Sequence, residues 1–297
     1  MRNLVLVALL AGCYRESAAP RQPVAPRAEQ HARAASDPLA FLEGDAVVVM
    51  GIDLARLRTS PLWPRIEPLV DAKLGATVAR FQAACGFDPI ARLRHVAFST
   101  RDYTQDPVTG VVVLRGLART ELEPCLVKTL GRERVTARDA DIVVVGGSAI
   151  AFAGAQTIVF ASGPSATLPR MRALLDGGAS LRRNPQFMEA YDRVDTTRDS
   201  WWIMNGPNAL QPMQALGVAA QDLVGWIDAA SGVTAKLTLR MPSAADAANL
   251  ATMAQPYLQL AQTMTQRLEV TAVETAVVVD VAMTDEQVVI AAGLLGL

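Results

Sequence analysis

Thr234-Ala235-Lys236-Leu237-Thr238-Leu239-Arg240 decides the fold, together with the residues that follow it. Its hydrophobic pattern predicts a β-strand, and Ser243-Ala244-Ala245-Asp246 resembles a capping box that opens a helix. That helix is expected to run to about residue 267, with Pro256 kinking or dividing it. Two further strands are predicted at 268–273 and 276–282. Together they indicate an α+β fold with an antiparallel sheet.

The same order of elements is predicted in the first half of the chain. Each half runs strand, helix, strand, strand, helix, strand, strand. We therefore predict two related α+β units, each an antiparallel sheet with helices on one face, close to the ferredoxin-like order. One continuous sheet shared by both halves is the alternative. The other predicted strands are 46–50, 95–100, 110–115, 134–137, 142–145, 149–152, 157–161, 200–204 and 224–228. The other main helices are 61–84, the one capped at 120–123, 165–175, 185–193, 209–220 and a terminal apolar helix capped by 284–287.

Four segments are predicted along the chain. They are a signal peptide at residues 1–12, a tether at 13–37, a first unit at 38–176 and a second unit at 177–297. The tether is rich in Ala, Pro, Arg, Gln and Glu and has almost no large apolar side chains. It cannot bury enough surface to offset the entropy of ordering, so we expect it to be disordered.

The N-terminal residues indicate where the protein resides. Arg2 precedes an apolar run that ends in Leu10-Ala11-Gly12-Cys13. A short basic segment, an apolar segment and small residues before a cleavage point are typical of a secretory signal peptide. The four residues that end the run resemble the lipobox of bacterial lipoproteins, a resemblance that covers the first 13 residues alone. An ordinary secreted protein, or a cytosolic protein with an apolar end, is the alternative.

The resemblance implies cleavage before Cys13 and acyl chains, such as palmitate, attached to that residue. Two or more acyl chains hold a protein stably on a membrane, whereas one gives marginal binding. Lipidated Cys13 would therefore make the membrane a partner of the chain in the cell envelope. In the class that the motif resembles, an Asp after the Cys commonly retains the protein at the inner membrane. Tyr14 stands there instead, which favours the outer membrane.

Charge and cysteine content narrow the possibilities further. The net charge of −1 and the lack of a basic run argue against a nucleic-acid partner. Once Cys13 is set aside, Cys85 and Cys125 remain. An even pair in an exported chain predicts a disulfide, which would contribute about 4 kcal/mol by closing a loop of about 40 residues. Two separate buried thiols are the alternative.

Few residues of the chain are suited to catalysis. Outside the tether there is one histidine, His95, on a predicted strand, and we expect it to be structural. The sequence carries no recognised hydrolase, zinc-peptidase or phosphate-loop motif, so we predict no cofactor, no metal site and no catalytic residue. Two pairs of neighbouring carboxylates, Glu121 with Glu123 and Asp139 with Asp141, are explained by a helix N-terminus and a hairpin turn.

Trp201 and Trp202 are the residues singled out for binding. Neighbouring strand residues point to opposite faces, so the two rings cannot enter one core unless both faces of the sheet are covered. One ring would then be an exposed anchor for a partner, a role in which tryptophan is enriched. A sheet covered on both sides, or a contact between domains, is the alternative.

These observations favour a non-enzymatic envelope lipoprotein, an adaptor or accessory protein that binds an envelope protein partner. A carrier or sensor of an apolar small molecule or lipid is the second hypothesis, because the chain is 51% hydrophobic and has adjacent tryptophans. A hydrolase of unrecognised type is the third.

Overall fold

The computed structural model describes residues 37–294 except 106–107, 131–134, 140 and 216. The chain divides into two compact units. The first unit comprises Lys73–Pro185 and the described residues up to Ala46, and the second unit comprises Val47–Ala72 and the residues from Gln186. Each unit mixes helices with an antiparallel sheet, so the predicted α+β class is confirmed.

The chain divides differently from the prediction, which placed the boundary between residues 176 and 177. Segment Val47–Ala72 precedes most of the first unit in sequence but belongs to the second. The cause is strand pairing, because β1 (Val48–Asp53) is hydrogen-bonded to β8 (Ser200–Asn205), about 150 residues later. Helix α3 (Trp63–Cys85) accordingly begins in the second unit and ends in the first.

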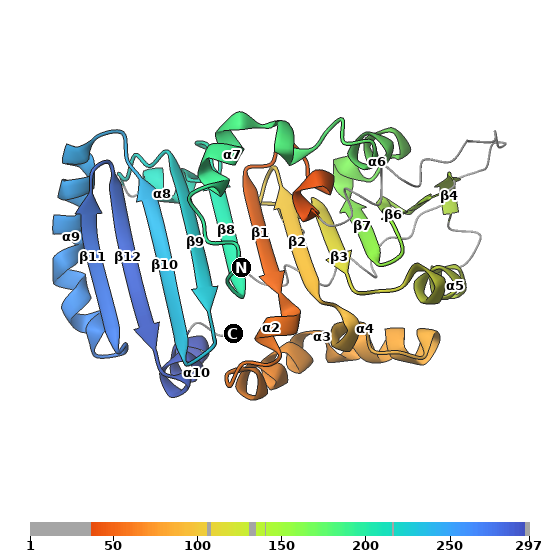
Figure 1. Ribbon diagram of the computed structural model, residues 1–297, viewed down its shortest axis with the longest axis horizontal. Coiled ribbons are helices and arrows are strands. Elements are labelled where there is room, and N and C mark those ends of the chain that lie inside the picture. The colour runs from red at the N-terminus through yellow and green to blue at the C-terminus, as the bar shows by residue number, and fades with distance from the viewer. Residues whose placement is uncertain (1–36, 106–107, 131–134, 140, 216, 295–297) are drawn as a thin grey trace. The chain divides into compact units, whose positions relative to one another are not determined.

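The first unit is built on a sheet with the strand order β2-β3-β7-β6-β5-β4 (Figure 1). Side chains on both faces of its central strands are buried, which explains their almost continuous apolar sequences. The strands are β2 (His95–Thr100), β3 (Val111–Arg115), β4 (Val135–Arg138), β5 (Ile142–Val145), β6 (Ser148–Phe152) and β7 (Thr157–Ser162), and the helices are α4 (Pro89–Arg92), α5 (Arg119–Leu130) and α6 (Leu168–Leu175) with the 3-10 turns η2 (Pro38–Phe41), η4 (Gly163–Ser165) and η5 (Leu181–Arg183).

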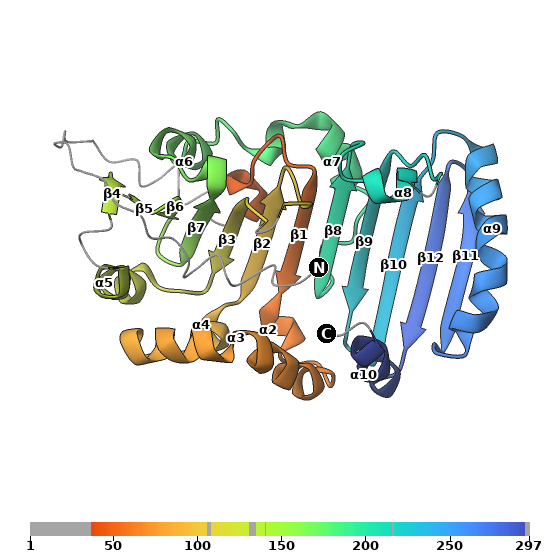
Figure 2. The same cartoon turned by 180° about the vertical axis from the view of Figure 1, so that it is seen from behind.

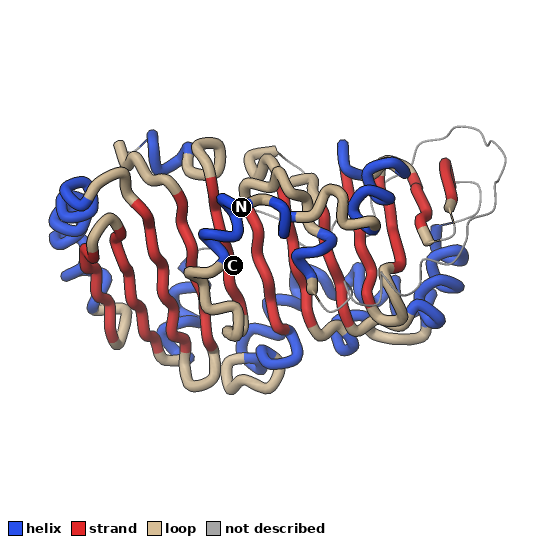
Figure 3. The backbone as a smooth tube through the Cα atoms, turned by 45° about the horizontal axis from the view of Figure 1, so that its top comes forward, coloured by secondary structure: helices blue, strands red, loops and turns tan. Residues whose placement is uncertain are grey.

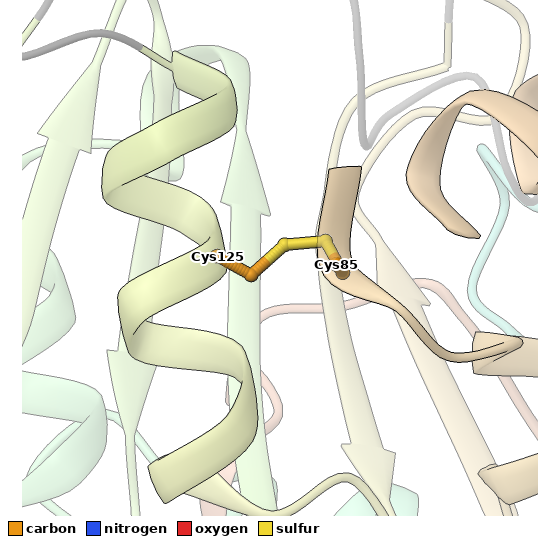
Figure 4. The surroundings of a disulfide bond; sticks show 2 residues. All are labelled: Cys85 and Cys125. Atoms are coloured by element: carbon orange, nitrogen blue, oxygen red, sulfur yellow. A yellow bond between two sulfur atoms is a disulfide. The ribbon is translucent and has the colours of Figure 1, made fainter. Parts of the chain in front are cut away.

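A disulfide joins two helices of the first unit, as the cysteine count predicts. Cys85 is the last residue of α3 and Cys125 lies in α5, and their Cα atoms are 5.1 Å apart. Figure 4 shows the Cys125 side chain reaching from α5 to the end of α3. The bond therefore fixes the end of α3 beside α5.

The second unit has the strand order β11-β12-β10-β9-β8-β1, all antiparallel (Figures 1 and 3). The strands not yet placed are β9 (Asp222–Asp228), β10 (Val233–Arg240), β11 (Arg267–Val273) and β12 (Ala276–Met283), and the helices are α2 (Leu54–Leu57), α7 (Pro185–Tyr191), α8 (Gln211–Ala215), α9 (Ala244–Gln262) and α10 (Asp285–Leu294).

The predicted caps of the second unit are present, but one predicted break is not. Ser243 Oγ accepts from the backbone N–H of Asp246 at the start of α9. At the start of α10, Thr284 Oγ1 accepts from the N–H of Gln287, whose side-chain oxygen accepts from the N–H of Thr284. Helix α9 is not divided at Pro256 and continues to Gln262.

Helices lie on both faces of the second sheet, not on one as predicted. Tyr191 of α7 packs edge-on against Trp201, with ring centroids 5.5 Å apart. Helix α9 instead lies along β11 and β12 (Figures 1 and 2). It covers the side of β11 that carries Leu268 and Val270, because these are half-buried while Arg267 and Glu269 are exposed. Leu268 and Trp201 point to opposite faces in the strand register.

The ferredoxin-like order is not confirmed, although the two units share the order of four strands, β2-β3-β7-β6 in the first and β9-β10-β12-β11 in the second. In the first unit, β2 and β3 precede α5, and the last strand after α5 returns to pair with β3. In the second unit, β9 and β10 precede α9, and the last strand after α9 returns to pair with β10. This is an antiparallel meander with a helical crossover.

Candidate functional site

One face of the second sheet is apolar across all six strands. Residues directly opposite one another in antiparallel strands point to the same face, so the registers define the residues of this face. We call the following set the apolar face: Val48, Met50, Ile52, Ser200, Trp202, Met204, Leu223, Gly225, Ile227, Ala235, Leu237, Leu239, Val277, Val279, Val281, Leu268, Val270 and Ala272. Ser200 is the one polar residue in it, so the face offers almost no hydrogen-bonding side chains.

Two ends of the apolar face are packed against helices. Leu62, Ala229 and Val233 form a cluster at one end, with Leu57, Ile66, Ile227 and Val288 packed against it from α2, α3, β9 and α10. At another end, Leu239 and Val277 are buried near the β11 and β12 side that α9 covers. These contacts form the hydrophobic core of the second unit.

Between these ends, most side chains of the apolar face on β1, β8, β9 and β10 are only half-buried. We call this part the open strip; it consists of Val48, Met50, Trp202, Met204, Leu223, Gly225 and Leu237, from β1, β8, β9 and β10. Gly225 is buried beneath the Trp202 ring, and the other six residues keep part of their surface exposed. The equivalent rows of the first sheet are buried, since Val96, Leu114, Ile158 and Phe152 are at most 7% exposed. The open strip is therefore a distinctive feature of the second unit.

The predicted tryptophan pair lies on β8, between β1 and β9, with one ring on each face of the second sheet. Trp201 is buried beneath α7, where its ring lies over Gly51 of β1. Trp202 is half-buried in the open strip, and its ring lies over Gly225 of β9. A Cβ atom at Gly225 would lie 2.5 Å from Trp202 Cζ2. Glycine therefore lets the indole lie flat on the sheet, as an aromatic patch among aliphatic side chains.

The helices of the second unit add exposed apolar side chains. Met253 and Tyr257 of α9 are 65% and 77% exposed, and they share one side of the helix because they are four residues apart. Ile290 of α10 is 60% exposed. Large apolar side chains exposed together at this level mark a binding surface more often than isolated ones do.

The opposite face of the second sheet is polar over β10. Its residues there are Thr234, Lys236, Thr238 and Arg240. Arg240 and Arg193 bind the same oxygen of Asp222, a fully buried carboxylate, at 2.7 and 2.8 Å. Such a pairing holds a buried charge in place, so we assign Asp222 a structural role.

A second ionic cluster lies at the start of β8 and the end of β9. Asp228 accepts from Arg198 at 2.9 Å, and the Arg198 guanidinium lies 4.7 Å from the centre of the Trp226 ring. Burial raises the pKa of Asp228, but the Ala230 N–H and the two nearby arginines more than offset it, so its pKa lies below the usual range. Asp195 also has a lowered pKa, chiefly because the Thr197 hydroxyl donates to its carboxylate.

The residues considered for catalysis do not converge. His95 is half-buried on β2 opposite Arg115. The carboxylates of Glu121, Glu123, Asp139 and Asp141 are each bound by an arginine. In the described part of the chain, no cluster of side chains is suited to hold a metal ion.

Cys13 and the tether up to residue 36 lie outside the described residues, so lipidation remains a prediction. Among the helices that the structure describes, none has both the length and the apolar character needed to span a bilayer.

The sequence singled out Trp202 but not the open strip around it. The signal was present in Val48, Met50 and Ile52, which alternate along one strand. Their shared face with Leu237 follows only from pairing between strands far apart in sequence.

The chain is similar in fold to TP0453, seen in three crystal forms. For crystal form IV the TM-score is 0.55 at 11% identity, over 86% of this chain and 96% of TP0453. Forms III and I give TM-scores of 0.54 and 0.53 at the same identity, over 85% of this chain. At this identity the likeness concerns the fold alone. No protein-family model matches the chain, and no curated protein matches it.

Proposed function

We propose that this chain is an envelope lipoprotein, anchored at a membrane through lipidated Cys13, whose folded region binds another envelope component without catalysing a reaction. The open strip is the observation that carries the binding role. Aliphatic side chains, Met50, Met204 and the Trp202 ring share one half-exposed surface there. Partly exposed apolar surface gains free energy when a partner removes it from water, at about 25 cal/mol per Å².

The anchor is tested by mass spectrometry of the mature N-terminus in the native cell envelope. We expect a cleaved chain that begins at Cys13 and carries acyl chains, and we expect it in the membrane fraction. The Cys13→Ser variant should lose the acyl mass and leave that fraction. An unmodified wild-type chain in the soluble fraction would refute the anchor. Separating inner and outer membranes then tests the expected outer-membrane location.

The binding role is tested separately by a pair of variants on β10. Leu237→Glu places a charge in the open strip, whereas Thr238→Glu places one on the polar face one residue away. We expect the first variant, and not the second, to lose a chemically cross-linked envelope complex. Retention of that complex by Leu237→Glu would refute the role of the strip, provided that both variants unfold at the same temperature as wild type.

A carrier of an apolar small molecule or lipid is the second candidate function. It is favoured by Trp202, whose flat ring supplies an aromatic surface within an otherwise aliphatic strip. Native mass spectrometry of the full chain would then show a bound mass that denaturation removes. If the mass is that of the polypeptide and its anchor alone, the carrier hypothesis fails.

We infer further that the two units arose from one ancestral α+β unit. The support is their common order, in which two paired strands, a crossover helix and a returning meander follow one another.

A further inference from the structure

The first unit shows how this arrangement of strands is covered by helices. Arg119 of α5 lies 4.8 Å from the centre of the Phe152 ring, so α5 lies on the face that carries Phe152, Ile158 and Leu114. The end of α3 lies beside α5, because Cys85 is bonded to Cys125 (Figure 4). Two helices thus lie together there, and the side chains of that face are buried.

In the second unit α9 is the helix at the corresponding place in the chain, and α2, α3 and α10 pack at one end of the apolar face. Helix α9 follows β10 as α5 follows β3, and it lies along β11 and β12. The segment that precedes β9 contains the five-residue helix α8, whereas the segment that precedes β2 contains the end of α3, a helix of 23 residues. The open strip is the part of the sheet that a second long helix would cover.

We propose that the open strip binds an amphipathic α-helix of a partner protein, laid beside α9. The inference rests on the proposed binding function and names the partner's structure. The strip continues the interface that α9 already makes, since Val279 and Val270 lie in the same row as Leu237 and Met50.

The dimensions of the strip fit a helix. Its four strands span three inter-strand spacings, about 14 Å. A helix with its side chains is about 10–12 Å across, so one helix covers the strip, whereas a single acyl chain is much narrower and leaves most of it in water.

The chemistry of the strip also fits a helix. A helix satisfies its backbone hydrogen bonds internally, so it can lie on a surface that offers none. An extended peptide would bury unpaired N–H and C=O groups there, because the Ser200 hydroxyl and the Trp202 indole N–H are the hydrogen-bonding side-chain groups of the whole apolar face. The strip therefore favours a helical partner over an extended one.

Site-specific photo-cross-linking of the full, membrane-anchored chain in its native cells tests the proposal. A benzophenone amino acid replaces Ala235 or Leu237, two residues apart on the apolar face, and Lys236 between them on the polar face is the matched control. Ala235 and Leu237 are about 6.6 Å apart along the strand, close to the rise of one helical turn, about 5.4 Å. We expect both to link to one protein, at partner residues three to five apart, and Lys236 not to link to it.

Each of the following outcomes would contradict a helical partner. Partner sites two apart would indicate an extended segment, and adducts with lipid alone would indicate an acyl ligand; in both cases the binding role of the strip survives. Adducts with a second copy of this chain would indicate self-association. No adduct at Ala235 or Leu237 beyond that at Lys236 would refute the binding role as well. If the Leu237 substitution prevents folding, Leu223 takes its place.

A charge in the strip provides an independent readout. With the cross-linker at Ala235, Leu237→Glu should lower the yield of the protein adduct about tenfold or more, because it buries an unpaired charge beneath the helix. Thr238→Glu should leave the yield unchanged. An unchanged yield in a folded Leu237→Glu chain would overturn the proposal.

Discussion

At the scale of single residues, two glycines determine how the tryptophan pair is accommodated. Trp201 lies over Gly51 and Trp202 over Gly225, each on a different face of the second sheet. A side chain at either glycine would occupy the space of the neighbouring indole. The glycines therefore allow large rings to lie flat on a sheet, which keeps Trp201 in the core and Trp202 level with the open strip.

We expect Gly225→Ala to destabilise the protein by about 1–3 kcal/mol, since the new Cβ would lie 2.5 Å from Trp202 Cζ2 and 3.0 Å from the Lys236 carbonyl oxygen. Urea unfolding measures the effect. The matched control repeats the substitution in a Trp202→Leu background, where most of the cost should disappear if the ring causes it. Equal costs in both backgrounds would show that the clash with the backbone dominates.

The lowered pKa of Asp195 predicts how the second unit responds to acid. A carboxyl group with a lower pKa in the folded state stabilises that state above its unfolded pKa of about 3.9, and the stabilisation is lost as the pH falls through the folded value. Asp195→Asn should therefore be less stable than wild type at pH 7, and the difference should shrink below about pH 4. Thermal unfolding from pH 7 to pH 3 measures both. A constant difference across that range would contradict the assignment.

At the scale of elements, the disulfide is the strongest local constraint on α3. Trp63 is the one buried residue of this 23-residue helix, so packing alone holds most of its length weakly. The bond to Cys125 fixes its last residue to α5. The C-terminal end of α3 is therefore held in place by a covalent bond, whereas other helices are held by buried side chains.

Removing the bond should cost about 4 kcal/mol of stability, because it closes a loop with a sequence separation of 40 residues. The Cys85→Ser, Cys125→Ser double variant, compared with the oxidised wild type by urea unfolding, measures this cost. Hydrogen exchange should rise first at the C-terminal end of α3, while β3 and β7 remain protected. Uniform loss of protection across the first unit would contradict this order.

Local patterns predicted the elements better than the pairing of strands. The strands at 95–100 and 142–145 were predicted with the bounds that the structure has, and both caps of the second unit are present. Hydrophobic period and capping residues are local signals, so they fix element type. The pairing of β1 with β8 joins residues far apart in the sequence, and no local sequence pattern predicts such a pairing.

At the scale of the whole molecule, the second unit is discontinuous in sequence. It takes β1, α2 and the start of α3 from Val47–Ala72 and the remainder from residue 186 onward. The open strip is equally discontinuous, since Val48 and Met50 come from the first segment and Trp202 and Leu237 from the second. A cut at the predicted boundary of residue 177 would therefore divide both the unit and its candidate site.

We expect a fragment of residues 177–297 to be poorly folded and to aggregate, because it lacks β1 and leaves the edge of β8 and the ring of Trp201 uncovered. Joining residues 47–72 to 186–297 through a flexible linker restores the strand and should give a monomer with cooperative unfolding. Size-exclusion chromatography and circular dichroism compare the two. If the 177–297 fragment proved to be a cooperative monomer, β1 would be dispensable, and the open strip would have to be redefined on β8, β9 and β10 alone.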